Sequence, residues 1–131
     1  MVDCQALSRL VGDGSVLSLA LFLLVMDPLL RDLEASGVGL SLNGYYAGGF
    51  LHADDIRTLA TSEEFLMKQV ELVKQFADKN LLKLNVNKCE IVLFSNHSSA
   101  VQFPKCEIDG AVIPAGVVGK CLGYQWKGAS K

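Results

Sequence analysis

An acidic pair between two short apolar segments constrains the fold of this chain most. Residues 48–53 and 56–60 flank Asp54 and Asp55. Each segment is bounded by residues that end regular structure, so the pattern predicts two short strands joined by a tight turn. Adjacent carboxylates at such a turn offer the hard oxygen ligands that Mg²⁺ prefers. Asp is also a common turn residue, so on the pair alone a purely structural or solubilising role stays open.

Length and composition predict one domain over residues 1–131. Hydrophobic residues make up 50% of the chain and charged residues 20%, which excludes a disordered chain. The longest apolar run, residues 16–26, is shorter than the roughly 20 residues of a membrane-spanning helix and predicts a buried helix. We therefore expect no membrane partner.

The cysteines and the first residues bear on where the protein acts. The four cysteines form no Cys-x-x-Cys pair, which argues against a zinc site and gives no obvious disulfide framework. The first residues lack a basic region followed by an apolar core, so no signal peptide is visible. We expect a reduced intracellular protein of the nucleus or cytoplasm that is not secreted.

Charge is unevenly distributed along the chain. Through residue 67 there are three arginines against nine acidic residues, whereas from Lys68 onward there are nine lysines against five acidic residues. A basic half beside an acidic pair suits a polyanionic ligand that is held by the lysines while metal ions neutralise the carboxylates. An ordinary solvated surface explains the charge pattern equally well.

Helical patterns occur in two regions. Residues 16–26 predict one helix, after which Asp27 suits an N-cap and Pro28 the first position of a second piece that extends to Ala35. Farther along, Thr61 and Glu64 match a capping box. It should open an amphipathic helix of about four turns that ends near Asn80.

Strand patterns dominate the remaining segments. Two dipeptides typical of hairpin turns, Asn43-Gly44 and Asp109-Gly110, separate short alternating segments. Further strands are expected at residues 82–85, 90–94 and 120–126. The combination predicts an α+β fold with an antiparallel sheet and helices packed on one face.

Four blocks of the chain together resemble the palm of a reverse transcriptase, most closely the non-LTR (LINE-like) retrotransposon type. Each block is weak alone, but their order makes the set specific. They are Gly-Ser-Val-Leu-Ser-Leu-Ala-Leu-Phe at residues 14–22, Phe-Leu-His-Ala-Asp-Asp at 50–55, Leu-Lys-Leu-Asn-Val-Asn-Lys-Cys-Glu at 82–90 and Cys-Leu-Gly-Tyr at 121–124. The second block is similar to the family's Tyr-Ala-Asp-Asp core. The resemblance implies a partial polymerase palm, from the Gly-Ser block to the primer-grip hairpin.

The resemblance also implies roles for individual residues. Asp54 and Asp55 would hold the catalytic Mg²⁺ (or Mn²⁺) ions, and Lys88 would lie near the leaving phosphates as a charge partner and proton donor. The implied partners are an RNA or DNA template with its primer, and a dNTP. Two further pairs complete the implied site, Gly14 and Ser15 at the nucleotide and template and Leu122 and Gly123 in the primer grip. Ordinary roles in a turn, a solvated loop or sheet packing remain open for these residues.

Several positions depart from the family pattern. Asp13 replaces a glutamine, Gly12 an arginine, Leu19 a proline and His52 a tyrosine. A carboxylate at position 13 is unfavourable beside nucleic-acid phosphates. The family's third catalytic carboxylate lies on a strand upstream of the Gly-Ser block, and no matching acidic block occurs in this chain.

These departures predict an RNA-directed DNA polymerase fragment from a retroelement that is inactive as an isolated chain. The missing upstream palm and fingers segment would then be a required partner. Two alternatives remain open: a non-catalytic nucleic-acid-binding or interaction module built on the lysine-rich half, and an inert α+β domain in which the Asp pair only makes a turn.

Overall fold

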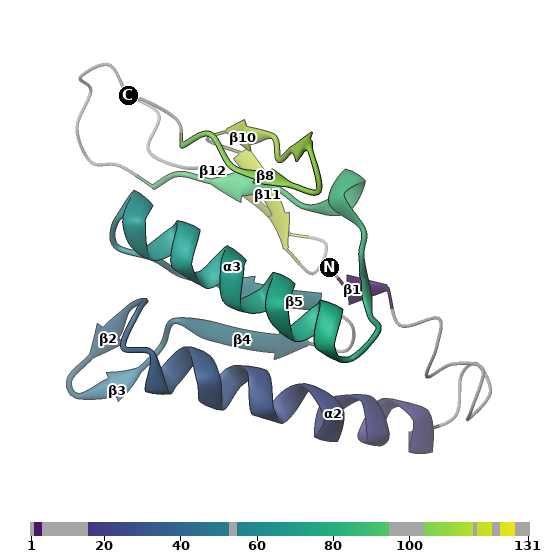
Figure 1. Cartoon of the computed structure of the whole chain (residues 1–131). Coiled ribbons are helices and arrows are strands. Elements are labelled where there is room, and N and C mark those ends of the chain that lie inside the picture. Colours follow the sequence, from purple (N-terminus) through teal and green to yellow (C-terminus); the bar gives the residue numbers. More distant parts are fainter. Residues whose placement is uncertain are drawn as a thin grey trace, which may run out of the picture. The chain divides into compact units, whose positions relative to one another are not determined.

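The computed structural model describes residues 2–3, 16–52, 55–94, 104–116, 118–121 and 124–127 (Figure 1). Side chains are described for residues 19–52, 55–94 and 104–116. Contacts between residues divide the chain into two compact units, Met1–Asn85 and Val86–Lys131, and each is described by itself. A single domain over residues 1–131 stays a prediction.

Helix α2 runs without interruption from Val16 to Ala35. The prediction of two pieces separated at Asp27 is wrong, because Pro28 lies inside the helix. Proline lacks the N–H that would bond to the carbonyl four residues earlier. That carbonyl belongs to Leu24, a residue that is 69% exposed. Asp27 does not cap a helix but accepts a hydrogen bond from Arg31 Nε at 2.6 Å.

Helix α3 extends from Glu63 to Lys79, and the proposed capping box at Thr61 is wrong by one residue. The N-cap is Ser62, whose hydroxyl accepts a hydrogen bond from the Phe65 amide at 3.2 Å. This bond satisfies one of the free N–H groups of the first turn. Glu64 instead forms an ion pair with the lysine four residues later, at 2.9 Å.

The core of the first unit lies between the two helices and the chain that follows α3. Helices α2 and α3 contact each other, and strand β4 (Gly49–His52), which Figure 1 shows alongside α2, contacts α2. The predicted helix end is confirmed, since Asn80 is the C-cap of α3. Beyond it, strand β6 (Lys83–Leu84) pairs with β1 (Val2–Asp3). The buried residues of the core are Phe22, Met26, Leu29, Leu33, Phe76, Ala77 and Leu82.

Two antiparallel hairpins connect α2 to α3. Strands β2 (Ser41–Leu42) and β3 (Tyr45–Tyr46) are joined by Asn43-Gly44. Both turn residues have positive φ, 52° and 83°, as the favoured two-residue hairpin turn requires, so this predicted turn is confirmed. The second hairpin, β4 (Gly49–His52) and β5 (Asp55–Thr58), confirms the two strands predicted around the acidic pair.

The second unit consists of short strands and one 3-10 turn. The predicted Asp109-Gly110 hairpin is confirmed, with φ of 51° and 79° at the turn. Of the strand predicted at residues 90–94, only Ile91–Val92 (β7) forms a strand. The described residues among 120–126 belong to two paired strands, β11 (Val118–Cys121) and β12 (Tyr124–Lys127), rather than to one. The elements are η1 (Val86–Lys88), β7 (Ile91–Val92), β8 (Glu107–Ile108), β9 (Ala111–Val112), β10 (Ala115–Gly116), β11 (Val118–Cys121) and β12 (Tyr124–Lys127).

Within the described residues, the sheets are small and mostly antiparallel, which is compatible with the predicted α+β class. Each of the six sheets has two strands, and β7 with β10 is the parallel pair. One continuous antiparallel sheet is therefore not formed by these residues. No helix in the described part of the chain is long and apolar enough to cross a membrane.

Candidate functional site

The candidate site is the outer face of the β4–β5 hairpin. His52 pairs with Asp55 across the hairpin, and Phe50 pairs with Arg57. Because side chains alternate between the faces of a strand, these four residues share one face. Phe50 and His52 are exposed, and Asp55 and Arg57 are half-buried. The hairpin therefore presents an acidic, a basic and two aromatic side chains on the same side.

The opposite face of this hairpin packs onto the core. Leu51 and Ile56, which pair across the strands, lie against the buried cluster of the two helices. Gly49 is packed so closely that an added Cβ would lie 3.3 Å from Leu30 and 3.4 Å from Leu33. With one face fixed by apolar packing, the hairpin cannot slip in register without moving Asp55 into the core.

Asp55 has a basic neighbour on its own strand. Arg57 Nη2 lies 3.4 Å from Asp55 Oδ2. The exposed fractions of the two side chains are 35% for Arg57 and 21% for Asp55, the lowest among the ion pairs of the described residues. Arg57 Nε is buried and has no hydrogen-bond acceptor among the described residues.

Gln69 of α3 anchors the base of the hairpin. This side chain is completely buried, and its Nε2 donates to the carbonyls of Gly48 at 3.3 Å and Leu59 at 3.0 Å. Those residues stand directly before β4 and directly after β5, and the Leu59 amide also donates to the Gly48 carbonyl at 2.9 Å. A third bond from Nε2 reaches the Val38 carbonyl at 3.4 Å. Together these bonds hold both strands of the hairpin to one residue of the helix.

Tyr46 completes this anchor on the side of the β2–β3 hairpin. Its hydroxyl donates to the Val38 carbonyl at 3.1 Å. The ring lies over Gly48, where an added Cβ would come within 2.5 Å of ring atoms. At Gly39, which has φ of 130°, an added Cβ would lie 2.9 Å from Gln69 Nε2. Close packing therefore requires a glycine at both positions, and the positive φ of Gly39 requires one there as well.

A model of the family described as reverse transcriptase (RNA-dependent DNA polymerase) matches residues 5–125. The match covers most of the chain and includes the hairpin with its acidic pair. The chain belongs to the reverse transcriptase family. Neither the curated proteins nor the solved structures compared with this chain gave a match.

Of the site residues predicted for this reverse transcriptase chain, the structure describes two. Asp55 begins β5 in the first unit. Lys88 ends the 3-10 turn of the second unit, and its side chain is exposed. The remaining five lie outside the described residues: Gly14, Ser15, Asp54, Leu122 and Gly123. Their predicted roles stay predictions.

Reverse transcriptases use divalent metal ions, and the donor chemistry of this hairpin fits such an ion. Asp55 supplies a hard carboxylate on the face that the core leaves open, and one of its oxygens is not engaged by Arg57 in the ion pair. Among the described residues no three His, Cys, Asp or Glu side chains come together as a metal site. Asp55 thus accounts for one ligand, and other ligands would come from outside the described residues.

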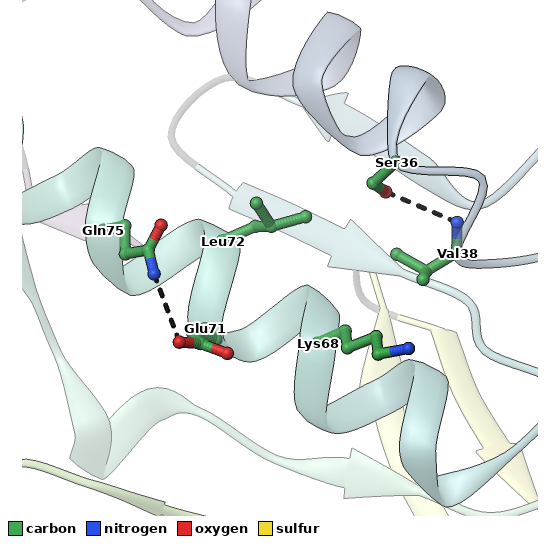
Figure 2. Close-up of a pocket in the computed structure, with 6 residues that line it drawn as sticks. All are labelled: Ser36, Val38, Lys68, Glu71, Leu72 and Gln75. Atoms are coloured by element: carbon green, nitrogen blue, oxygen red, sulfur yellow. Dashed lines mark hydrogen bonds between the residues drawn. The ribbon is translucent and has the colours of Figure 1, made fainter.

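A pocket of about 270 Å³ lies elsewhere in this reverse transcriptase chain, beside α3 (Figure 2). None of the predicted site residues lines it. Its polar groups are already paired, with the Gln75 amide donating to Glu71 at 3.2 Å and the Val38 amide to the Ser36 hydroxyl at 3.4 Å. The lining residues are Ser36, Val38, Lys68, Glu71, Leu72 and Gln75.

Sequence reasoning missed Arg57 and Gln69. Gln69 had a signal, because it lies three residues after Leu66 and four before Val73, so it interrupts the apolar stripe of α3. A polar residue on a buried stripe indicates a buried hydrogen-bonding role. The sequence also contained a signal for Arg57. It lies two residues after Asp55, and alternation along a strand places residues two apart on the same face.

Proposed function

We propose that this chain is part of the palm of a retroelement RNA-directed DNA polymerase of the LINE-like type. The observation that carries the proposal is the register of the β4–β5 hairpin. It leaves two residues, one of them Asp54, between the paired His52 and Asp55. The acidic pair therefore belongs to the end of a hairpin whose inner face is fixed by the core. The family match over residues 5–125 supports the same reading.

The proposed roles follow the chemistry of each residue. Asp54 and Asp55 hold divalent cations, Mg²⁺ or Mn²⁺, which when bound would stabilise the attacking 3′-hydroxyl and the leaving pyrophosphate. Lys88 pairs with the charge of the leaving phosphates. Gly14 and Ser15 lie close to the incoming nucleotide and the template, where glycine lets the backbone approach. Leu122 and Gly123 support the primer backbone.

We further propose that the chain does not extend primers by itself. Asp13 stands where the family has a glutamine, and it brings a negative charge to a position that faces nucleic acid in the resemblance. No acidic block of this sequence matches the third catalytic carboxylate. With fewer ligands, a divalent ion is bound more weakly and oriented less well.

Manganese binding tests the acidic pair directly. We expect Mn²⁺, followed by electron paramagnetic resonance, to bind the unmodified chain and to bind Asp54→Asn and Asp55→Asn about tenfold more weakly, because each substitution removes a charged ligand. Asp32→Asn is the matched control, since it removes the same charge from an exposed position of α2. Measurable binding with the same affinity in all four proteins would refute a metal site at the hairpin.

Primer extension tests the inactivity of the isolated chain. With a primed RNA template, dNTPs and Mg²⁺ or Mn²⁺, we expect no extension by the chain alone. Extension that disappears in Asp54→Asn would contradict this proposal and establish that the chain catalyses nucleotidyl transfer.

The lysine-rich half gives a second measurement, the affinity for a primer–template duplex at several salt concentrations. Binding through phosphates weakens steeply as salt rises. Salt-sensitive binding without metal binding at the acidic pair would favour a non-catalytic nucleic-acid-binding module instead.

A further inference from the structure

Arg57 lies on the same face of the hairpin as Asp55, one of the two proposed metal ligands. It is two residues after Asp55 on β5, and its Nη2 is 3.4 Å from Asp55 Oδ2. The guanidinium group keeps its positive charge at any pH at which the protein is folded. A fixed cation therefore already neutralises part of the acidic pair.

The environment of this ion pair reduces screening by solvent. The other described ion pairs have at least one side chain that is 50% exposed or more, whereas Arg57 and Asp55 are 35% and 21% exposed. Charges that are partly withdrawn from water interact more strongly than fully solvated ones. The effect of Arg57 on a nearby second cation should therefore be measurable.

Asp55 is the one acceptor that the described residues offer to the Arg57 guanidinium. Its Nη2 contacts Asp55, and its Nε is buried without an acceptor there. A buried donor without an acceptor is unfavourable, and no other hydrogen bond among these residues would compensate Arg57 for the loss of the Asp55 contact. Arg57 and a divalent ion thus depend on the same carboxylate.

We propose that Arg57 is the resident counter-ion of the acidic pair and competes with divalent cations for Asp55. A metal ion at Asp54 and Asp55 must share the carboxylate with the guanidinium and overcome its repulsion. Arg57 thereby raises the concentration of Mg²⁺ or Mn²⁺ at which the site fills. This inference rests on the proposed metal-binding function of the hairpin and assigns Arg57 a role in positioning and tuning rather than in catalysis.

The dissociation constant for Mn²⁺ in the complete chain, without nucleic acid, tests this proposal. Arg57→Gln keeps a polar side chain of similar reach but removes the charge, and we expect Mn²⁺ to bind about three- to tenfold more tightly. Arg57→Lys keeps the charge and should bind within about twofold of the unmodified chain. Arg31→Gln is the matched control, because it removes the same charge from an exposed pair on α2 and should leave affinity unchanged.

The outcomes separate this inference from the proposed function. Mn²⁺ binding that depends on Asp54 but is equal or weaker in Arg57→Gln overturns the role of Arg57 and leaves the metal site standing. Binding that is detectable only in Arg57→Gln, and lost when Asp54 is also replaced by asparagine, supports both. Absence of Asp54-dependent binding in the unmodified chain and in Arg57→Gln overturns both, provided that circular dichroism shows the variants folded.

Discussion

At the scale of single residues, Gln69 is the buried polar group on which the position of the acidic hairpin depends. Replacing it with leucine removes three hydrogen bonds from Nε2. The Leu59 carbonyl loses its hydrogen-bond donor among the described residues, whereas the Val38 and Gly48 carbonyls keep bonds from Tyr46 and Leu59. We expect Gln69→Leu to lower the free energy of unfolding by about 2–3 kcal/mol, measured by urea denaturation.

A second glutamine of α3 provides the control for this substitution. Gln75 is exposed, and among the described residues its amide donates to Glu71 of the same helix at 3.2 Å. Gln75→Leu should change the free energy of unfolding by less than about 0.5 kcal/mol. Equal effects of the two substitutions would show that the buried hydrogen bonds of Gln69 do not hold the hairpin.

Tyr46 makes the stability of the first unit vary with pH in the alkaline range. Burial raises the pKa of its hydroxyl above the ordinary value of 10.0; a hydrogen bond from Gln69 opposes this shift and the Glu34 carboxylate adds to it. The folded chain therefore holds this proton more tightly than the unfolded chain does. The Tyr46 hydroxyl therefore contributes its full stabilisation below the ordinary pKa of 10.0. This stabilisation is lost as pH rises from 10.0 through the raised pKa of the folded chain.

Tyr46→Phe should remove this alkaline loss. Near neutral pH we expect the substitution to cost about 1 kcal/mol, because the hydrogen bond to the Val38 carbonyl is gone. The difference from the unmodified chain should then shrink as pH rises above 10.0. Tyr45→Phe, at a residue that is 79% exposed, is the control and should change stability by less than about 0.5 kcal/mol. A difference between Tyr46→Phe and the unmodified chain that does not vary with pH would contradict the prediction.

At the scale of elements, α2 buries one side and leaves an apolar surface on the other. Phe22, Met26, Leu29 and Leu33 recur at helical spacing and form part of the core. Among the side chains described in the first half of the helix, four leucines are exposed: Leu19 at 45%, Leu21 at 36%, Leu23 at 39% and Leu24 at 69%. Exposed apolar side chains of this kind promote association and dye binding in isolated domains.

The isolated chain should therefore bind a hydrophobic dye in its folded state, and Leu24→Gln should reduce this binding without lowering the unfolding midpoint. Leu29→Gln is the contrasting variant, because Leu29 is fully buried. It should instead destabilise the chain by several kcal/mol, since it buries a polar group in the core. A folded, monomeric chain with no dye fluorescence would show that the exposed leucines do not form a binding surface.

At the scale of the whole molecule, local rules predicted hairpins well and helix continuity poorly. Asn43-Gly44 and Asp109-Gly110 fix their turns through positive φ, which depends on those two residues alone. Pro28 could have begun a second helix, but apolar positions on both sides of it pack onto one core, and that packing outweighs the local cost of proline. Tertiary contacts of this kind cannot be read from a short window of sequence.

The candidate site shows the same limit. Turn chemistry and strand alternation account for the hairpin and for the position of Asp55 on its outer face. The sequence was therefore sufficient to predict these two features. The three carbonyls that meet Gln69 come from residues 10 to 31 positions away along the chain. Their convergence depends on the packing of α3, which no local pattern encodes.

The two compact units should differ in their ability to fold alone. All members of the principal core, from Phe22 to Leu82, and the pair β1–β6 lie within residues 1–85. In the second unit, the buried apolar residues described are Cys106, Ile108 and Ile113. Chains of this smaller size rarely bury enough surface to fold without further support.

We therefore expect residues 1–85 to unfold cooperatively in circular dichroism and residues 86–131 to show no cooperative transition. Residues 1–62 provide the control, because this shorter chain lacks α3 and with it Phe76, Ala77 and the Gln69 hydrogen bonds. It should remain unfolded. If residues 1–85 fail to fold while the complete chain folds, the second unit must stabilise the first, and the hairpin that carries Asp55 depends on both.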